Sequence, residues 1–281
     1  MKIRYILCFL AVICIWNTQA QFKIPDEATL KAFRSSKTYI VLEDVMFSEF
    51  NSIIKDVAQR HWKITQYEII SLAKFESLSK TTNASFLMIV IGEYSGIGKN
   101  ANFNVLSLMM GHKSGDVNKM PEILSVPLSA YSEDGDEDDY GYKLGGVMEG
   151  IQYAVKNILT KKVNISVATV KDIFNNYSRE VKTKELWLNK EDLSSPVNTA
   201  EKIKNIYPYK VSITSEEKIQ QAIDEKREDV VFLHKVACKS TCIKFIISCH
   251  DGKLLYGDYH SISGKEPDGF LPKDFKALIE N

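Results

Sequence analysis

The stretch that decides the fold is residues 37–92, KTYIVLEDVMFSEFNSIIKDVAQRHWKITQYEIISLAKFESLSKTTNASFLMIVIG. Apolar residues from Phe50 to Val57 recur with helical spacing, and Ser48 before them is a favourable N-cap residue. The runs rich in β-branched and aromatic residues on either side are typical of strands. The pattern therefore predicts strand, helix, strand, helix and strand: 38–45, a helix from Ser48, 67–71, a helix after Ser71, and 85–91.

Residues 184–237, KELWLNKEDLSSPVNTAEKIKNIYPYKVSITSEEKIQQAIDEKREDVVFLHKVA, give the same order of elements. The strands predicted here are 185–193, 209–214 and 229–236, with one helix after Thr199 and another that carries Ile219, Ala222 and Ile223. Alternating strands and helices favour parallel pairing through crossover connections. Because the element order and lengths match, we interpret the two segments as a duplication. A chance likeness between two ordinary α/β segments is the alternative.

Each copy continues into an antiparallel hairpin and ends in a helix: 102–110, 123–131 and 140–160 in the first, and 242–250, 253–260 and 272–280 in the second. Asp251-Gly252 is a strong hairpin signal and predicts that residue 249 pairs with 254, and 247 with 256. The predicted fold class is α/β (α+β), with two repeated β-α-β-α-β units, each extended by a hairpin and a closing helix. The predicted divisions are a signal peptide, the first repeat, a connecting helix and the second repeat: 1–20, 21–162, 163–183 and 184–281.

The first residues, MKIRYILCFLAVICIWNTQAQ, follow the three-part pattern of a secretory signal peptide. Lys2 and Arg4 precede an apolar run that is too short to span a bilayer, and Ala20 is the small residue before the predicted cleavage at Gln21. A buried N-terminal helix is the alternative. We expect an exported protein, periplasmic or secreted, and no membrane span in the rest of the chain, where no apolar run is long enough.

Charge and composition restrict the kinds of partner. The chain has 36 Lys and Arg residues and 36 Asp and Glu residues, and loss of Lys2 and Arg4 with the signal keeps it near neutral. A near-neutral chain offers no electrostatic basis for binding nucleic acid or an anionic membrane. Hydrophobic residues make up 44%, which suits an ordinary globular core. The expected partner is therefore an unidentified envelope protein or a small ligand.

The stretch KVACKSTCIKFIISCHDGKLLYGDYH, residues 235–260, gathers residue types that serve in metal and redox sites. Cys238 and Cys242 flank Lys-Ser-Thr, which is one residue longer than redox motifs use, and no second ligand pair at zinc-site spacing accompanies them. The short loop between two predicted strands suits a disulfide between Cys238 and Cys242; two free thiols are the alternative. Cys249 falls on the predicted core face of the hairpin, as a packed thiol. We therefore interpret the stretch as a sheet rather than a site.

Two further polar segments resemble ligand loops. In SEDGDEDDY, residues 132–140, Asp134, Asp136 and Asp138 alternate as calcium ligands often do, but the Gly and Glu of an EF-hand are missing. An irregular calcium loop and a solvated acidic loop are both open, and the second is the simpler interpretation. GEYSGIGKN, residues 92–100, is one residue too long for a phosphate-binding loop, and Asn100 stands where that loop needs a hydroxyl residue. No nucleophile-elbow, zinc-protease or dinucleotide motif occurs, so we predict no catalytic, cofactor-binding or metal-binding residues.

Four segments carry a resemblance to known proteins: KTYIVLEDVMFSEFNSIIKD, MPEILSVPLSAY, VFLHKV and YHSISGKEPDGFLPKDFK. They resemble secreted proteins of Bacteroidetes whose function is uncharacterised, and the likeness extends over most of the predicted mature chain. More loosely, the order of elements is similar to the amino-terminal domain of TolB-type periplasmic proteins. The resemblance implies an exported bacterial protein and supplies no activity or site residues, because a shared fold does not fix function.

Two functional hypotheses remain from the sequence. The first is a non-enzymatic binding or interaction module, exported and most simply periplasmic, in which the two repeats pack as a pseudo-dimer. The second is a hydrolase of an unrecognised type with a site between the repeats, which would require a histidine beside a carboxylate and a nucleophile.

Overall fold

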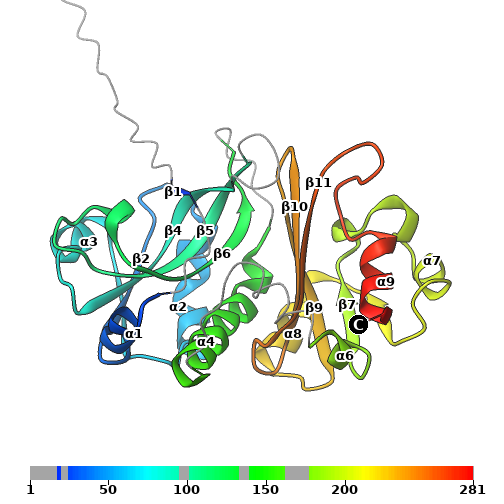
Figure 1. Cartoon of the computed structure of the whole chain (residues 1–281), viewed down its shortest axis with the longest axis horizontal. Helices are drawn as coiled ribbons and strands as arrows, with labels where there is room; N and C mark the ends of the chain where they lie inside the picture. The colour runs from blue at the N-terminus through cyan, green and yellow to red at the C-terminus, as the bar shows by residue number, and fades with distance from the viewer. Residues whose placement is uncertain (1–17, 20–24, 95–100, 133–138, 162–176, 281) are drawn as a thin grey trace, which may run out of the picture.

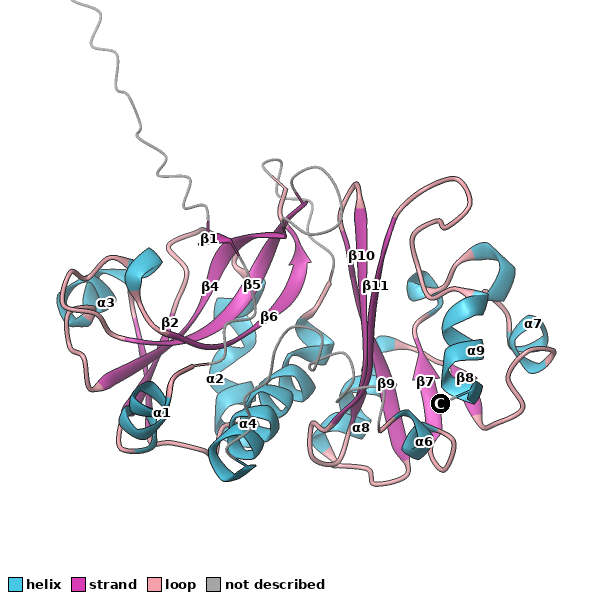
Figure 2. Ribbon diagram, viewed as in Figure 1, coloured by secondary structure: helices cyan, strands magenta, loops and turns pink. Residues whose placement is uncertain are grey.

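The computed structural model describes residues 18–19, 25–94, 101–132, 139–161 and 177–280. Two mixed sheets lie side by side, each with helices packed against it (Figure 1; Figure 2). Among the described residues, none of the helices combines the length and apolar character needed to cross a bilayer.

The first sheet has the strand order β3-β2-β4-β5-β6. β2 pairs in parallel with β3 and β4, and β5 and β6 extend the sheet in antiparallel fashion. Its strands are β2 (Lys37–Val41), β3 (Tyr67–Ile70), β4 (Ala84–Tyr94), β5 (Ala101–Met110) and β6 (Glu122–Ala130). Its helices are α1 (Glu27–Arg34), α2 (Glu49–His61), α3 (Leu72–Leu78) and α4 (Leu144–Lys161), with short 3₁₀ turns η1 (Val117–Lys119) and η2 (Gly141–Lys143).

The second sheet repeats this topology strand for strand, with the order β8-β7-β9-β10-β11. β7 is parallel to β8 and β9, and β10 and β11 follow in antiparallel fashion. Its strands are β7 (Glu185–Leu188), β8 (Val211–Ile213), β9 (Val230–Ala237), β10 (Thr241–Ser248) and β11 (Leu254–Ser261). Its helices are α6 (Ser178–Val181), α7 (Ala200–Lys204), α8 (Glu216–Asp224) and α9 (Pro272–Glu280), with 3₁₀ turns η3 (Lys190–Asp192) and η4 (Ser195–Val197). The predicted two-unit α/β fold is confirmed.

The repeats differ at the helix that follows the first parallel strand, α2 in one and α7 in the other. In the first repeat α2 is an unbroken helix of 13 residues, begun by Ser48, whose side chain accepts the backbone N–H of Asn51. In the second repeat Pro196 lies in the first turn of η4, and the corresponding chain is divided into two 3₁₀ turns and the five-residue α7. Proline removes a backbone donor and fixes φ, so a long helix cannot run through this segment.

The two repeats share one hydrophobic core. Helix α4 packs against α2 and β6 of its own repeat, and also against α8 and β10 of the second. Ile219 and Ile223 of α8 and Phe232 of β9 belong to the same buried cluster as the residues of α2 and α4. Helix α9, the counterpart of α4, lies on the far side of the second sheet (Figure 1). The repeats therefore pack together through different faces, which is a head-to-tail contact.

The β10–β11 hairpin has a different register from the predicted one. Ile247 pairs with Leu254 and Ile246 with Tyr256, with an irregularity between Ile246 and Ile247. The connection is longer than a two-residue turn, because the N–H of Gly252 donates to the carbonyl of Ser248 over 3.1 Å. Gly252 has φ +70, and a Cβ there would lie 2.3 Å from the backbone carbon of Glu149, so the turn is shaped by its contact with α4.

The structure describes only part of the predicted signal peptide and of the predicted connecting helix. Thr18–Gln19 form the two-residue β1, which pairs in parallel with Gly92 and Glu93 of β4. These two residues belong to the predicted signal peptide, and that prediction stays untested. Of the predicted connecting helix, 163–183, the structure describes residues 177–183, including α6; the rest lies outside the described residues.

Candidate functional site

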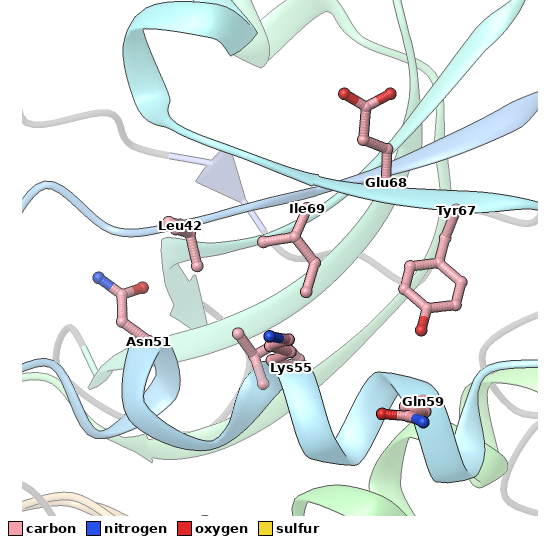
Figure 3. A pocket seen from close by; sticks show the side chains of 8 residues that line it. Leu42, Asn51, Lys55, Gln59, Tyr67, Glu68 and Ile69 are labelled. Atoms are coloured by element: carbon pink, nitrogen blue, oxygen red, sulfur yellow. The ribbon is translucent and has the colours of Figure 1, made fainter.

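A groove of about 570 Å³ lies between helix α2 and the edge strand β3. Its walls come from consecutive elements of the first repeat, and Leu42, just after β2, also lines it (Figure 3). The lining residues are Leu42, Asn51, Ile54, Lys55, Gln59, Tyr67, Glu68 and Ile69. A volume of this size is in the range of ligand-binding pockets.

The side chains of β3 alternate between the two faces of the sheet. Tyr67 and Ile69 point toward α2 and line the groove, whereas Glu68 points to the opposite face (Figure 3). There Glu68 accepts a hydrogen bond of 2.6 Å from Nζ of Lys37. The apolar part of the groove lining is formed by Leu42, Ile54 and Ile69. The strand period of two thus places an apolar wall inside the groove and an exposed ion pair outside.

The polar groups inside the groove come from α2. Asn51, Lys55 and Gln59 follow one another at intervals of one helical turn along the wall (Figure 3). Asn51 is already engaged, because its side chain accepts the N–H of Glu43 over 2.9 Å and donates to the carbonyl of Glu43 over 2.8 Å. Lys55 lines the groove, and it forms no ion pair within the part of the chain that the structure describes.

The outer edge of β3 is open. Strand β3 ends the sheet, and no other described strand pairs with its outer side. Its bonds to β2 include Thr38 N–H to Gln66 O at 2.9 Å and Leu42 N–H to Ile70 O at 2.8 Å. Backbone groups in a parallel ladder alternate in direction, so the N–H and C=O groups of Tyr67 and Ile69 face outward. The same two residues line the groove, so exposed backbone donors and acceptors border an apolar wall.

An apolar loop lies at the Leu42 end of the groove. Val45, Met46 and Phe47 are 59%, 87% and 99% exposed, and they make up most of the large exposed apolar side chains in the described residues. Phe47 has φ 64, which is a strained conformation for a bulky residue. The loop is anchored by the bonds from Asn51 to Glu43 and by Ser48 Oγ, which donates to Glu43 over 2.6 Å. Strained, exposed and anchored apolar groups indicate an interaction surface.

A buried histidine lies between the repeats, where the hydrolase hypothesis requires one. His61, at the end of α2, is 2% exposed. Its Nδ1 lies 2.8 Å from Oε1 of Glu149 on α4, and its Nε2 lies 2.9 Å from Oδ1 of Asp224 on α8. Both ring nitrogens thus lie within hydrogen-bond distance of carboxylates. A general base needs a ring nitrogen that faces a proton to abstract, so this histidine gives the hydrolase hypothesis no support.

The other side chains that the sequence singled out do not assemble into a site. Cys238 and Cys242 are free thiols, and the predicted disulfide is not formed. Ala237 pairs with Cys242 across β9 and β10, so Cys238 projects from the opposite face of the hairpin. Cys238 packs beside Ile243, whereas Cys242 Sγ lies 3.9 Å from the carbonyl of Gly269.

The two buried thiols are unreactive in the folded protein. Burial raises the pKa of both Cys242 and Cys249 to about 12, so neither is a nucleophile at neutral pH. Asp134, Asp136 and Asp138, the calcium candidates, lie outside the described residues. Among the residues that are described, no group of three or more His, Cys, Asp or Glu side chains is placed to hold a metal ion.

Fold and groove together define a two-repeat α/β protein with an open strand edge beside an apolar groove. Comparisons with family models, with curated proteins and with solved structures give no match to this chain. The resemblance to secreted Bacteroidetes proteins and to TolB-type domains stays a prediction.

The sequence predicted the walls of the groove but not the groove itself. Residues of β3 and α2 were assigned correctly, yet Val45 was placed in the preceding strand, which ends at Val41. The signal that marks the site is the run Val45-Met46-Phe47, because three apolar residues outside any regular element have no core to enter.

Proposed function

We propose that this protein is a non-enzymatic binding module that holds an extended segment of a partner polypeptide in the groove between α2 and β3. The segment adds to the sheet as a further strand, bonded to the outer edge of β3. The observation that carries the proposal is the open edge of β3 beside an apolar groove, with three exposed apolar residues at one end. Strand addition of this kind obtains affinity from main-chain bonds and specificity from side-chain pockets.

The short edge suits reversible binding. Strand β3 has four residues, and two of them direct their backbone groups outward. Natural proteins keep edge strands short or charged to avoid uncontrolled pairing with other chains. A short edge flanked by the exposed Lys37–Glu68 pair is consistent with selective rather than general strand pairing. Most of the affinity must then come from apolar contacts with Leu42, Ile69 and the loop at 45–47.

We further propose that the module works outside the cytoplasm, in the periplasm or beyond. The support for this is the basic, apolar and small-residue pattern of residues 1–20. In that setting the partner is a protein of the cell envelope or a secreted polypeptide. Fractionation of the native host with an antibody to the chain, and the N-terminal sequence of the recovered protein, tests this directly. Recovery of an uncleaved chain in the cytoplasmic fraction would contradict the proposed export.

The proposed binding is tested by selection of peptides from a displayed library against the full chain, with affinities of the selected peptides then measured by calorimetry. Ile69→Glu places a charge on the groove wall and should weaken binding at least tenfold. The matched control is Ile213→Glu on β8, the equivalent partly buried edge position in the second repeat. Ile213→Glu should bind as the unaltered chain does. Equal effects of the two substitutions would show that the peptides bind elsewhere.

A further inference from the structure

We infer that the groove selects an extended segment with an acidic side chain at its central inward position and apolar side chains at the inward positions on either side. This inference rests on the proposed strand addition at β3 and specifies the chemistry of the segment. It follows from the spacing of the groove's polar groups, from their charge and from which of them are already engaged.

The spacing of α2 matches the repeat of an added strand. Asn51, Lys55 and Gln59 are four residues apart, which corresponds to about 6 Å along a helix. Alternate residues of a strand are about 6.6 Å apart, so successive inward side chains of the segment face successive turns of α2. In Figure 3 the Asn51 end of the helix lies by Leu42 and the Gln59 end by Tyr67, with Lys55 between them under Ile69. The inward side chain beside Ile69 therefore meets Lys55.

The charge of the groove is positive at this central position. Lys55 is the cation among the lining residues, and the Glu68 carboxylate lies on the other face of β3, where it bonds to Lys37. Asn51 is committed to Glu43 and contributes little to recognition of a ligand. Lys55 has no ion-pair partner among the described residues, so a carboxylate from the segment would supply one. Ammonium groups act as flexible point charges, so either Asp or Glu meets this requirement.

The carboxylate is that of a side chain rather than of a chain end. Lys55 lies midway along the groove, opposite Ile69 (Figure 3). A C-terminal carboxylate at that point would end the segment there and leave part of the outward edge of β3 unpaired. A segment that continues past Lys55 bonds to both Tyr67 and Ile69, and its next inward side chain reaches Leu42 and the exposed apolar loop at 45–47.

The test uses synthetic peptides of one β-prone host sequence that differ at a single central position: Glu, Gln or Lys. The full chain should bind the Glu peptide roughly fivefold more tightly than the Gln peptide, and the Lys peptide least, since an exposed ion pair contributes up to about 1 kcal/mol. Lys55→Glu should reverse the order of the Glu and Lys peptides. Lys218→Glu on α8 makes the same change in net charge away from the groove and should leave the order unchanged.

The possible outcomes distinguish the acidic preference from the proposed strand addition at β3 on which it rests. Equal binding of the three peptides to the full chain and to Lys55→Glu, with binding still lost in Ile69→Glu, would overturn the acidic preference alone. Failure of every peptide to bind would overturn both. A self-association that Ile69→Glu abolishes, measured by sedimentation without peptide, would show that the groove is filled by a second copy and would also overturn the inference.

Discussion

Nε2 of His61 lies 2.9 Å from Oδ1 of Asp224, so the last residue of the helix that forms one wall of the groove is bonded to the second repeat. The other ring nitrogen bonds to Glu149 of α4, which lies between the two sheets. Helix α2 is thereby fixed at its far end by contacts outside its own sheet. The groove in the first repeat depends in this way on the packing of the second.

His61→Ala should destabilise the protein by about 2–4 kcal/mol, because it removes a buried side chain together with its bonds to the buried Glu149 and the partly exposed Asp224. Arg60→Ala is the matched control on the same helix end, since its ion pair with Asp224 is largely exposed. Arg60→Ala should lower the unfolding free energy by about 0–1 kcal/mol. Urea unfolding followed by circular dichroism measures both. If His61→Ala lowers the unfolding free energy no more than Arg60→Ala does, the role assigned to the buried bonds of His61 is contradicted.

Gly252→Ala should destabilise the protein by about 2–3 kcal/mol. Its φ of +70 disfavours a side chain, and a Cβ would lie 2.3 Å from the backbone carbon of Glu149, where no flexible group can yield. Gly264→Ala is the control, because a Cβ there meets nothing within 4 Å. It should change the unfolding free energy by less than about 0.5 kcal/mol. Thermal unfolding of the two variants under identical conditions compares them.

Phe47→Gly should stabilise the protein while weakening ligand binding. Phe47 is 99% exposed, so its removal forfeits no buried area, and glycine adopts φ 64 without the strain of about 1 kcal/mol that a bulky residue carries. The greater freedom of glycine in the unfolded chain offsets part of the gain. Met46→Gly, also highly exposed, relieves no strain and should lower stability slightly. Calorimetric unfolding and peptide affinity are measured together; a Phe47→Gly variant that is less stable than Met46→Gly would show that the loop is not strained.

Glu49 should contribute stability that is lost as the pH rises from about 5 to about 8. Burial raises the pKa of Glu49 from the ordinary 4.5 to about 7, together with a hydrogen bond to Asp139 and the negative charge of Asp139. A carboxyl group with a raised folded-state pKa stabilises fully below its unfolded pKa, and that contribution is lost as pH rises through the folded value. Glu49 is half-buried, so solvent screening reduces its share to about 1 kcal/mol.

Glu49→Gln is the matched test of this pH dependence, since the amide oxygen still accepts the N–H of Gly141 that bonds to Glu49 over 2.9 Å. The unfolding free energy of the variant, relative to that of the unaltered chain, should therefore increase between pH 5 and pH 8. Parallel curves over that range, from urea unfolding at each pH, would show that Glu49 does not titrate there.

Native thiol labelling should distinguish Cys238 from the other two described cysteines. Cys238 is partly exposed, whereas burial raises the pKa of Cys242 and Cys249 to about 12. A water-soluble alkylating reagent at neutral pH should modify Cys238 first, and the others only after unfolding. Peptide mapping by mass spectrometry identifies the sites. Recovery of a Cys238–Cys242 disulfide from the folded protein would restore the pairing expected from the sequence and contradict the opposite-face geometry.

Local signals explain why the order of elements could be predicted. The apolar spacing from Phe50 to Val57 and the cap at Ser48 lie within one stretch of chain, and α2 forms where they indicate, with the Asn51 N–H bonded to Ser48. The strand runs around Ile40 and Ile69 are equally local. The duplicated topology then follows, because parallel strands joined by helical crossovers and extended by a hairpin leave few ways to order the strands.

Contacts between distant residues explain what the sequence did not predict. The hairpin is irregular at Ile246, and its turn at Gly252 lies against Glu149, more than 100 positions away in the chain. The candidate site is a similar case. Tyr67, Ile69 and Lys55 carry no motif, and they form a groove only because β3 lies at the edge of the sheet and α2 packs beside it.

The sequence by itself thus determined the two-repeat α/β architecture, since periodicity and capping act between residues a few positions apart. Tertiary structure alone decided that the repeats meet head to tail, that Cys238 and Cys242 project from opposite faces, and that the edge of β3 stays open beside a groove. The physical reason is that packing faces, register and exposure are set by the balance of long-range contacts, which no local pattern of side chains encodes.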